Sequence, residues 1–170
     1  MPRARTAALR LTRLTVLTLV AVPLALSLLC APASATTAQA ETSARAAAAK
    51  VDAARRIALR QIGDRYQYGA EGPHRFDCSG LVFFSTRHAG LRVPRTSSAQ
   101  ARFMRRIGRN AMRPGDFVFF TGGSGVYHVG VYLGRRDGRR IMVHAPSPGT
   151  KVRKDAVWGN RWFAGTLRGR

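Results

Sequence analysis

The chain has 170 residues, which fits about one domain, and 29 Lys and Arg against 8 Asp and Glu give it a formal net charge of +21. With 45% apolar and 22% charged residues, its composition is that of a folded domain and not of a disordered tail. Two cysteines exclude a disulfide-dense scaffold and a four-cysteine zinc site, and eight acids leave little material for a calcium or two-metal carboxylate site.

The first 35 residues have the three parts of a secretory signal peptide. Four arginines and no acid come before an apolar run from Leu14 to Cys30, and residues 33–35 form an A-x-A cleavage signal. We therefore predict a mature N-terminus at Thr36 and a secreted protein that is extracellular or associated with the cell wall. A membrane anchor and a lipidated Cys30 are the alternatives, but the run is short for a spanning helix and contains Pro23.

Removal of this segment changes the charge and the cysteine count. Four arginines leave with it, so the net charge falls to about +17, and Cys78 becomes the one remaining cysteine. A lone thiol in an exported protein has no disulfide partner within its chain. It is either buried and inert, or it is reactive.

The mature chain divides into a linker and one domain. Residues 36–44 are rich in Thr, Ala and Ser without a hydrophobic period and are predicted to be the linker, and residues 45–170 form the domain. Apolar residues at helical spacing predict an amphipathic helix over residues 45–62. A second helix of about twelve residues is predicted to start at Cys78, with Asp77 as N-cap and Gly90 as the stop.

A third helix, polar and basic, is predicted over residues 96–107, and strands dominate the rest of the chain. The predicted strands are Asp116–Thr121, Val126–Leu133, Arg140–His144 and Trp162–Leu167. Helices first and an antiparallel meander afterwards predict an α+β fold.

Cys78 is the first candidate for chemistry. Backbone N–H groups and the helix dipole at a helix N-terminus favour thiolate over thiol, and the same N–H groups can hold an oxyanion. A small buried core residue is the plain alternative, although the flanking Asp77, Ser79 and Gly80 are small or polar. A zinc site built from Cys78 and two histidines is a further, weaker alternative.

A thiol nucleophile needs a base, and His128 is the candidate. Strand alternation places His128, Gly130 and Tyr132 on one face of their strand. His144 on the next strand would bond the ring of His128 and fix its tautomer, provided that both histidines share a face. A two-residue turn without a compensating bulge would separate them, so a functional pair predicts a three-residue loop that ends at Gly138.

Four segments together resemble the NlpC/P60 family of cell-wall cysteine peptidases. They are Asp77-Cys78-Ser79-Gly80-Leu81-Val82, residues 113–120 (RPGDFVFF), residues 128–134 (HVGVYLG) and Val143-His144-Ala145. Each segment alone is weak evidence for the family, but the four segments in this order and at plausible spacing over residues 53–167 are specific for it. The resemblance implies a papain-like α+β fold, in which the cysteine-bearing helix packs on an antiparallel sheet that carries the histidine.

The resemblance also implies roles for single residues. Cys78 is the nucleophile, His128 the base and His144 the polar third residue, and no metal or organic cofactor is needed. The residues that match substrate-contacting or cleft-lining positions of the family are Tyr66, Asp77, Ser79, Arg95 and Ser97, of which the last two could equally cap a helix and be solvated. Arg65 and Ala70 depart from the common pattern, where Pro and Gly are frequent.

The family implies hydrolysis of peptidoglycan stem peptides, typically between the γ-carboxyl of D-glutamate and diaminopimelate or lysine. An amidase or acyltransferase with the same thiol chemistry, an inactive wall-binding relative, and a basic protein that binds wall polymers without catalysis are the alternatives. No nucleic-acid-binding motif accompanies the basic residues, so nucleic acid is not an expected partner. We expect a monomer that an anionic wall polymer can attract.

Overall fold

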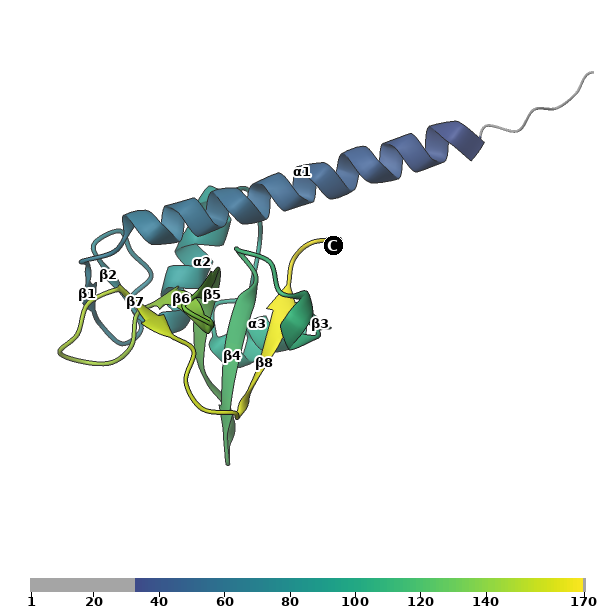
Figure 1. The fold of residues 1–170 in the computed structure, drawn as a ribbon. Coiled ribbons are helices and arrows are strands. Elements are labelled where there is room, and N and C mark those ends of the chain that lie inside the picture. Colours follow the sequence, from purple (N-terminus) through teal and green to yellow (C-terminus); the bar gives the residue numbers. More distant parts are fainter. Residues whose placement is uncertain (1–32, 170) are drawn as a thin grey trace, which may run out of the picture. The chain divides into compact units, whose positions relative to one another are not determined.

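The structure is a computed structural model that describes residues 33–169, and the predicted signal peptide lies almost wholly outside these residues. The described residues belong to one compact unit (Figure 1). None of the helices within residues 33–169 is long and apolar enough to cross a membrane.

Helix α1 spans Ala33–Arg60 and includes the predicted linker, so residues 36–44 are helical. This stretch is rich in alanine, the strongest helix former, and has no Gly or Pro before Gly63. Residues 37–46 are exposed, so this part of the helix buries no apolar face and carries no hydrophobic period. Val51, Ala54 and Ala58 further along are buried and follow the predicted amphipathic pattern.

The two shorter helices begin at capped residues. Helix α2 spans Cys78–His88, and the Asp77 side chain caps it by accepting from the Gly80 N–H at 2.6 Å. Helix α3 spans only Ser97–Phe103, because the chain becomes extended at Met104 and continues as strand β3, Arg105–Ile107. The predicted helix over residues 96–107 therefore extends four residues too far at its C-terminal end.

Six strands form one antiparallel sheet in the order β3-β8-β4-β5-β6-β7, which confirms the α+β class (Figure 1). The other strands of the sheet are β4 (Phe117–Gly122), β5 (Gly125–Arg136), β6 (Arg139–His144), β7 (Arg153–Ala156) and β8 (Trp162–Thr166). Strands β1 (Arg65–Tyr66) and β2 (Arg75–Phe76) form a small parallel pair, and Arg109–Ala111 is a single 3-10 turn.

The sheet buries residues on both faces. On one face, Phe117, Phe119 and Val129 pack with residues of α1 and α2. On the other face, Phe120, Tyr132, Met142 and Trp162 form a second cluster. The alternation predicted for β5 is confirmed, because Val129 and Val131 face the helices while Tyr132 faces the second cluster.

The β5–β6 hairpin departs from the predicted loop. Arg136 pairs with Arg139, so the turn has two residues, Asp137 and Gly138, with φ values of 49° and 73°. A bulge between Tyr132 and Gly134 then shifts the register by one residue. The prediction of a three-residue loop is wrong, but the bulge restores the pairing that brings both histidines to one face.

Candidate functional site

Cys78 is the first residue of α2 and lies against β5. The backbone N–H groups of Val129, which follows His128, and of Ser79 donate to its sulfur. The nucleophile candidate is thus held by the residue next to the base candidate. The thiol is half-buried, and residues 33–169 contain no second cysteine that could form a disulfide with it.

The helix start does not make Cys78 a thiolate in the resting protein. Burial raises the pKa of the Cys78 thiol above its usual range, and the two backbone N–H groups offset this only in part. The nearby carboxylate of Asp77 raises the pKa further. Desolvation therefore outweighs the effect of the helix start, and the resting group is a neutral thiol, contrary to the expectation from sequence.

His128 and His144 begin a chain of hydrogen bonds that crosses three strands. His128 Nε2 lies 2.7 Å from His144 Nδ1, and His144 Nε2 lies 2.9 Å from Asp155 Oδ2. The Nε–H of Arg153 donates to the same Asp155 oxygen at 2.7 Å. These hydrogen bonds use Nε2 of the His128 ring and do not involve its Nδ1.

Gly130 leaves space that side chains of the neighbouring strand β6 use. A Cβ atom built at Gly130 would lie 2.6 Å from the sulfur of Met142 and 3.4 Å from the Cβ of His144. A larger residue at position 130 would therefore require the Met142 side chain, which lies on the same face as His144, to move.

Trp158, in the loop between β7 and β8, covers the histidine pair. Its ring centroid lies 5.6 Å from that of His128 and 5.4 Å from that of His144, and it stacks on Phe120 at 4.0 Å. The two imidazoles are only 5% and 1% exposed. The indole therefore shields the pair from water on the side of the second core cluster.

Burial keeps both imidazoles neutral. It lowers the pKa of His128 from 6.5 to about 3, and the neighbouring His144 adds to this shift. Burial also lowers the pKa of His144, although the hydrogen bond and the charge of Asp155 oppose it. At neutral pH the Cys78 thiol and the His128 imidazole are therefore both neutral, and burial makes the resting imidazole a weaker base than a free histidine.

These shifts predict that the protein loses stability in mild acid. Between pH 6.5 and about 3 the unfolded chain protonates residue 128 while the folded chain does not, so the free energy of unfolding falls as pH decreases through this window. The expected slope for this one group is about 1.4 kcal/mol per pH unit. Urea unfolding at pH 7, 6 and 5 measures it.

Two variants test the origin of the slope. His128→Gln should remove the contribution of His128 to the pH dependence of the free energy of unfolding. His74→Gln, at an exposed position, should leave that pH dependence unchanged. A free energy of unfolding that is constant between pH 7 and pH 5 would contradict the depressed pKa.

Asp77 and Arg95 form the second polar group of the site. The Arg95 guanidinium donates to both carboxylate oxygens of Asp77, at 2.8 and 3.1 Å, and to the Ser79 hydroxyl at 3.0 Å. Its Nε lies 3.0 Å from Glu71. Burial alone would raise the pKa of Asp77, but the hydrogen bonds from Arg95 and from the Gly80 N–H outweigh burial and hold the pKa below 3.8.

A groove of about 410 Å³ opens beside the cysteine. All five residues predicted to contact substrate line it together with Cys78: Tyr66, Asp77, Ser79, Arg95 and Ser97. Burial raises the pKa of the Tyr66 phenol, as do the nearby Cys78 and Asp77. The roles of these five residues toward a substrate stay predictions. In this structure the Arg95 guanidinium contacts Asp77, Ser79 and Glu71.

Sequence reasoning missed three residues of this site. Asp155 lies on β7, which was not predicted because it is a short, charged edge strand without apolar alternation. Trp158 lies in a loop, and Tyr127, which lines the groove, precedes the predicted base. Within residues 33–169, no cluster of three or more His, Cys, Asp or Glu side chains could hold a metal ion.

Known proteins are similar in sequence to this chain. The chain is 40% identical over 105 residues to a probable endopeptidase p60 of Listeria monocytogenes serovar 1/2a, an overlap of 62% of this chain and 20% of the relative. It is 37% identical over 125 residues to a probable endopeptidase of Corynebacterium glutamicum (strain R), an overlap of 74% and 54%. The chain thus spans about a fifth to a half of these relatives' lengths.

A solved structure shares the fold. The peptidoglycan hydrolase RipB of Mycobacterium tuberculosis superposes with a TM-score of 0.61 at 26% identity, over 82% of this chain and 73% of that one. The model of the NlpC/P60 family matches residues 63–170, which include α2, α3 and the whole six-stranded sheet. The protein therefore belongs to the NlpC/P60 family.

Proposed function

We propose that the protein is a secreted cysteine endopeptidase that hydrolyses peptidoglycan stem peptides between the γ-carboxyl of D-glutamate and diaminopimelate or lysine. The observation that carries the proposal is the structural connection between Cys78 and His128. Cys78 accepts a hydrogen bond from the residue next to His128, and the far side of the His128 ring is held at 2.7 Å by His144. The names of the relatives above support this class of reaction.

The reaction follows from these groups. As the Cys78 sulfur attacks the amide carbonyl, the thiol proton moves to His128, and backbone N–H groups at the start of α2 stabilise the oxyanion. The C–N bond then breaks, and His128 gives its proton to the leaving amine. Water, deprotonated by His128, hydrolyses the thioester and regenerates the thiol.

Product analysis tests the proposed bond. Digestion of purified peptidoglycan with the protein should release fragments whose new N-terminus is diaminopimelate or lysine, with the dipeptide that ends in D-glutamate left on the glycan. Mass spectrometry of the soluble and bound fractions identifies both ends. Release of the whole stem peptide would instead indicate an amidase, and transfer to an added amine without hydrolysis would indicate an acyltransferase.

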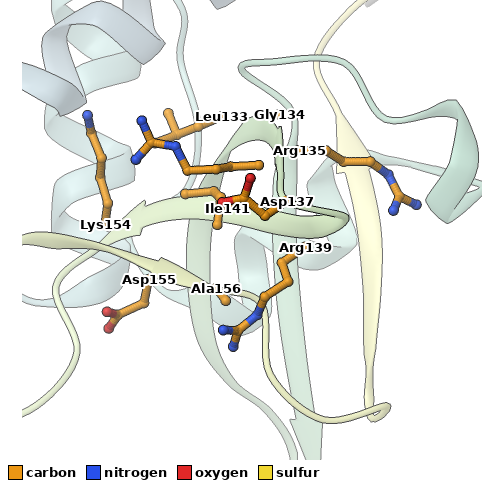
Figure 2. Close-up of a pocket in the computed structure, with 10 residues that line it drawn as sticks. Leu133, Gly134, Arg135, Asp137, Arg139, Ile141, Lys154, Asp155 and Ala156 are labelled. Carbon is orange, nitrogen blue, oxygen red and sulfur yellow. The ribbon is translucent and has the colours of Figure 1, made fainter.

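Binding to an anionic wall polymer is the second candidate function, and a basic groove favours it. The groove, about 590 Å³ in volume, lies at the β5–β6 hairpin and β7 (Figure 2). Its apolar residues are Leu133, Ile141 and Ala156, and its charged residues are four cations (Arg135, Arg136, Arg139 and Lys154) and two acids (Asp137 and Asp155), so positive charge is in excess. Clustered cations attract a polyanion over a range set by ionic strength.

Retention on insoluble cell walls measures this attraction. Binding should decrease as salt rises from 50 to 500 mM, as expected for screened charges, on the order of tenfold or more. The double variant Arg136→Gln/Arg139→Gln should bind less at low salt, whereas the matched variant Arg45→Gln/Arg56→Gln on α1 should bind as the unchanged protein does. Salt-independent retention would argue against a charge-based contact.

A further inference from the structure

Asp155 ends the hydrogen-bonded chain that starts at His128. Its Oδ2 lies 2.9 Å from His144 Nε2 and 2.7 Å from Arg153 Nε. The carboxylate is about one-third exposed, while the imidazole that it contacts is 1% exposed. The buried pair of imidazole rings is therefore hydrogen-bonded, through His144, to a negatively charged carboxylate.

The sheet register explains this contact. Strand β6 pairs with β7 so that Met142 opposes Asp155 and His144 opposes Arg153, which places the four side chains on the same face. Lys154 points to the opposite side of the sheet from Asp155 (Figure 2). A single-residue shift of β7 would bring Lys154 to the histidine face and remove the carboxylate.

Asp155, the acceptor at the end of this series of hydrogen bonds, determines which ring nitrogen of each histidine carries a proton. A carboxylate only accepts hydrogen bonds, so His144 must carry its proton on Nε2, and its Nδ1 is then a lone pair. That lone pair can accept only if His128 carries its proton on Nε2. His128 Nδ1 is consequently unprotonated, which is the form that a base beside a thiol requires.

Arg153 strengthens this order. Its Nε–H always donates, so the oxygen that faces both Arg153 and His144 must be an acceptor. Burial would otherwise disfavour a charge, yet the hydrogen bonds from Arg153 and His144 keep the pKa of Asp155 below 3.8. Arg153 also opposes a positive charge on His144 and so favours the neutral ring.

We propose that Asp155 is a positioning residue that, through His144, fixes the Nε2–H tautomer of both histidines and leaves His128 Nδ1 free to take the Cys78 proton. Its kinetic effects rest on the function proposed above. The tautomers themselves do not, because they can be measured without substrate.

Nitrogen-15 NMR of the histidine side chains tests the tautomers in the unchanged protein at pH 7. Both buried histidines should be protonated at Nε2 and unprotonated at Nδ1, with assignments taken from His74→Gln and His88→Gln, which replace the two exposed histidines. An Nδ1–H tautomer at His144 would overturn the proposal, whether or not the protein hydrolyses peptidoglycan.

Two substitutions at position 155 distinguish loss of the hydrogen-bond acceptor from a change in side-chain size. Asp155→Leu removes the acceptor at similar size, so an Nδ1–H population should appear at His144 and kcat should fall about 100-fold with KM changed less than about twofold. Asp155→Asn keeps an acceptor, because Arg153 turns the amide oxygen toward His144, and should lose less than about tenfold. Asp52→Leu, which removes an ion-paired carboxylate of α1, is the matched control and should keep full kcat.

The kinetic outcomes decide the proposal together with NMR. Unchanged kcat in Asp155→Leu would overturn it, as would a fall in kcat with His144 still wholly in the Nε2–H form, because such a fall would be structural. If Asp155→Leu does not fold, the tautomers of the unchanged protein and of Asp155→Asn decide in the same way. Absence of hydrolysis by the unchanged protein would refute the proposed function and leave the NMR test intact.

Discussion

Replacement of Cys78 by alanine is expected to reduce the release of peptide fragments from purified peptidoglycan by more than about 10⁴-fold. In the proposed reaction the sulfur is the atom that forms the acyl-enzyme, and within residues 33–169 it is the one cysteine sulfur. Chromatographic quantification of the soluble fragments measures the loss.

The alanine variant should keep its fold, which makes the loss interpretable. Cys78 is half-buried, and its alanine replacement leaves the Asp77 cap and the hydrogen bonds of α2 in place. The urea unfolding curve should therefore move little. Ser124→Ala, in the exposed β4–β5 turn, is the matched control and should hydrolyse at the unchanged rate. Full hydrolysis by the Cys78→Ala variant would remove the covalent mechanism proposed for this protein.

Replacement of Arg95 by methionine is expected to cost about 3 kcal/mol of the free energy of unfolding at pH 7. The substitution leaves the Asp77 carboxylate, which is 6% exposed, without the guanidinium that contacts both of its oxygens. It also frees Ser79 and Glu71 from their shared partner. Urea unfolding at pH 7 measures the loss.

A second substitution should recover much of that stability. Asn at position 77 still caps α2 but carries no charge, so Arg95→Met/Asp77→Asn should be more stable than Arg95→Met alone. Arg45→Met, which breaks an exposed ion pair of α1 with Glu41, should be indistinguishable from the unchanged protein. A double variant less stable than the single one would mean that the Arg95 effect does not arise from an unpaired buried charge.

Much of the fold and the centre of the site could be predicted because their signals are local. An N-cap followed by an apolar run places a helix at Cys78, and strict alternation places His128 and Tyr132 on one strand face. Elements without such a signal were missed. Strand β3 consists of two arginines and an isoleucine, and β7 is charged along most of its length, so neither shows apolar alternation.

Residue patterns along the chain were enough to predict the α+β class, the cysteine at a helix start, the histidine strand and membership of the NlpC/P60 family. The remaining features depend on three-dimensional packing. A bulge near Leu133, and not the turn, brings His144 beside His128, and the register of an edge strand places Asp155 behind both. Burial, which no local pattern reports, makes the resting pair a neutral thiol and a neutral imidazole. Pairing between distant strands and desolvation depend on the whole packed chain. For that reason the candidate nucleophile and base could be found from sequence, while the contact with Asp155 and the protonation of the site could not.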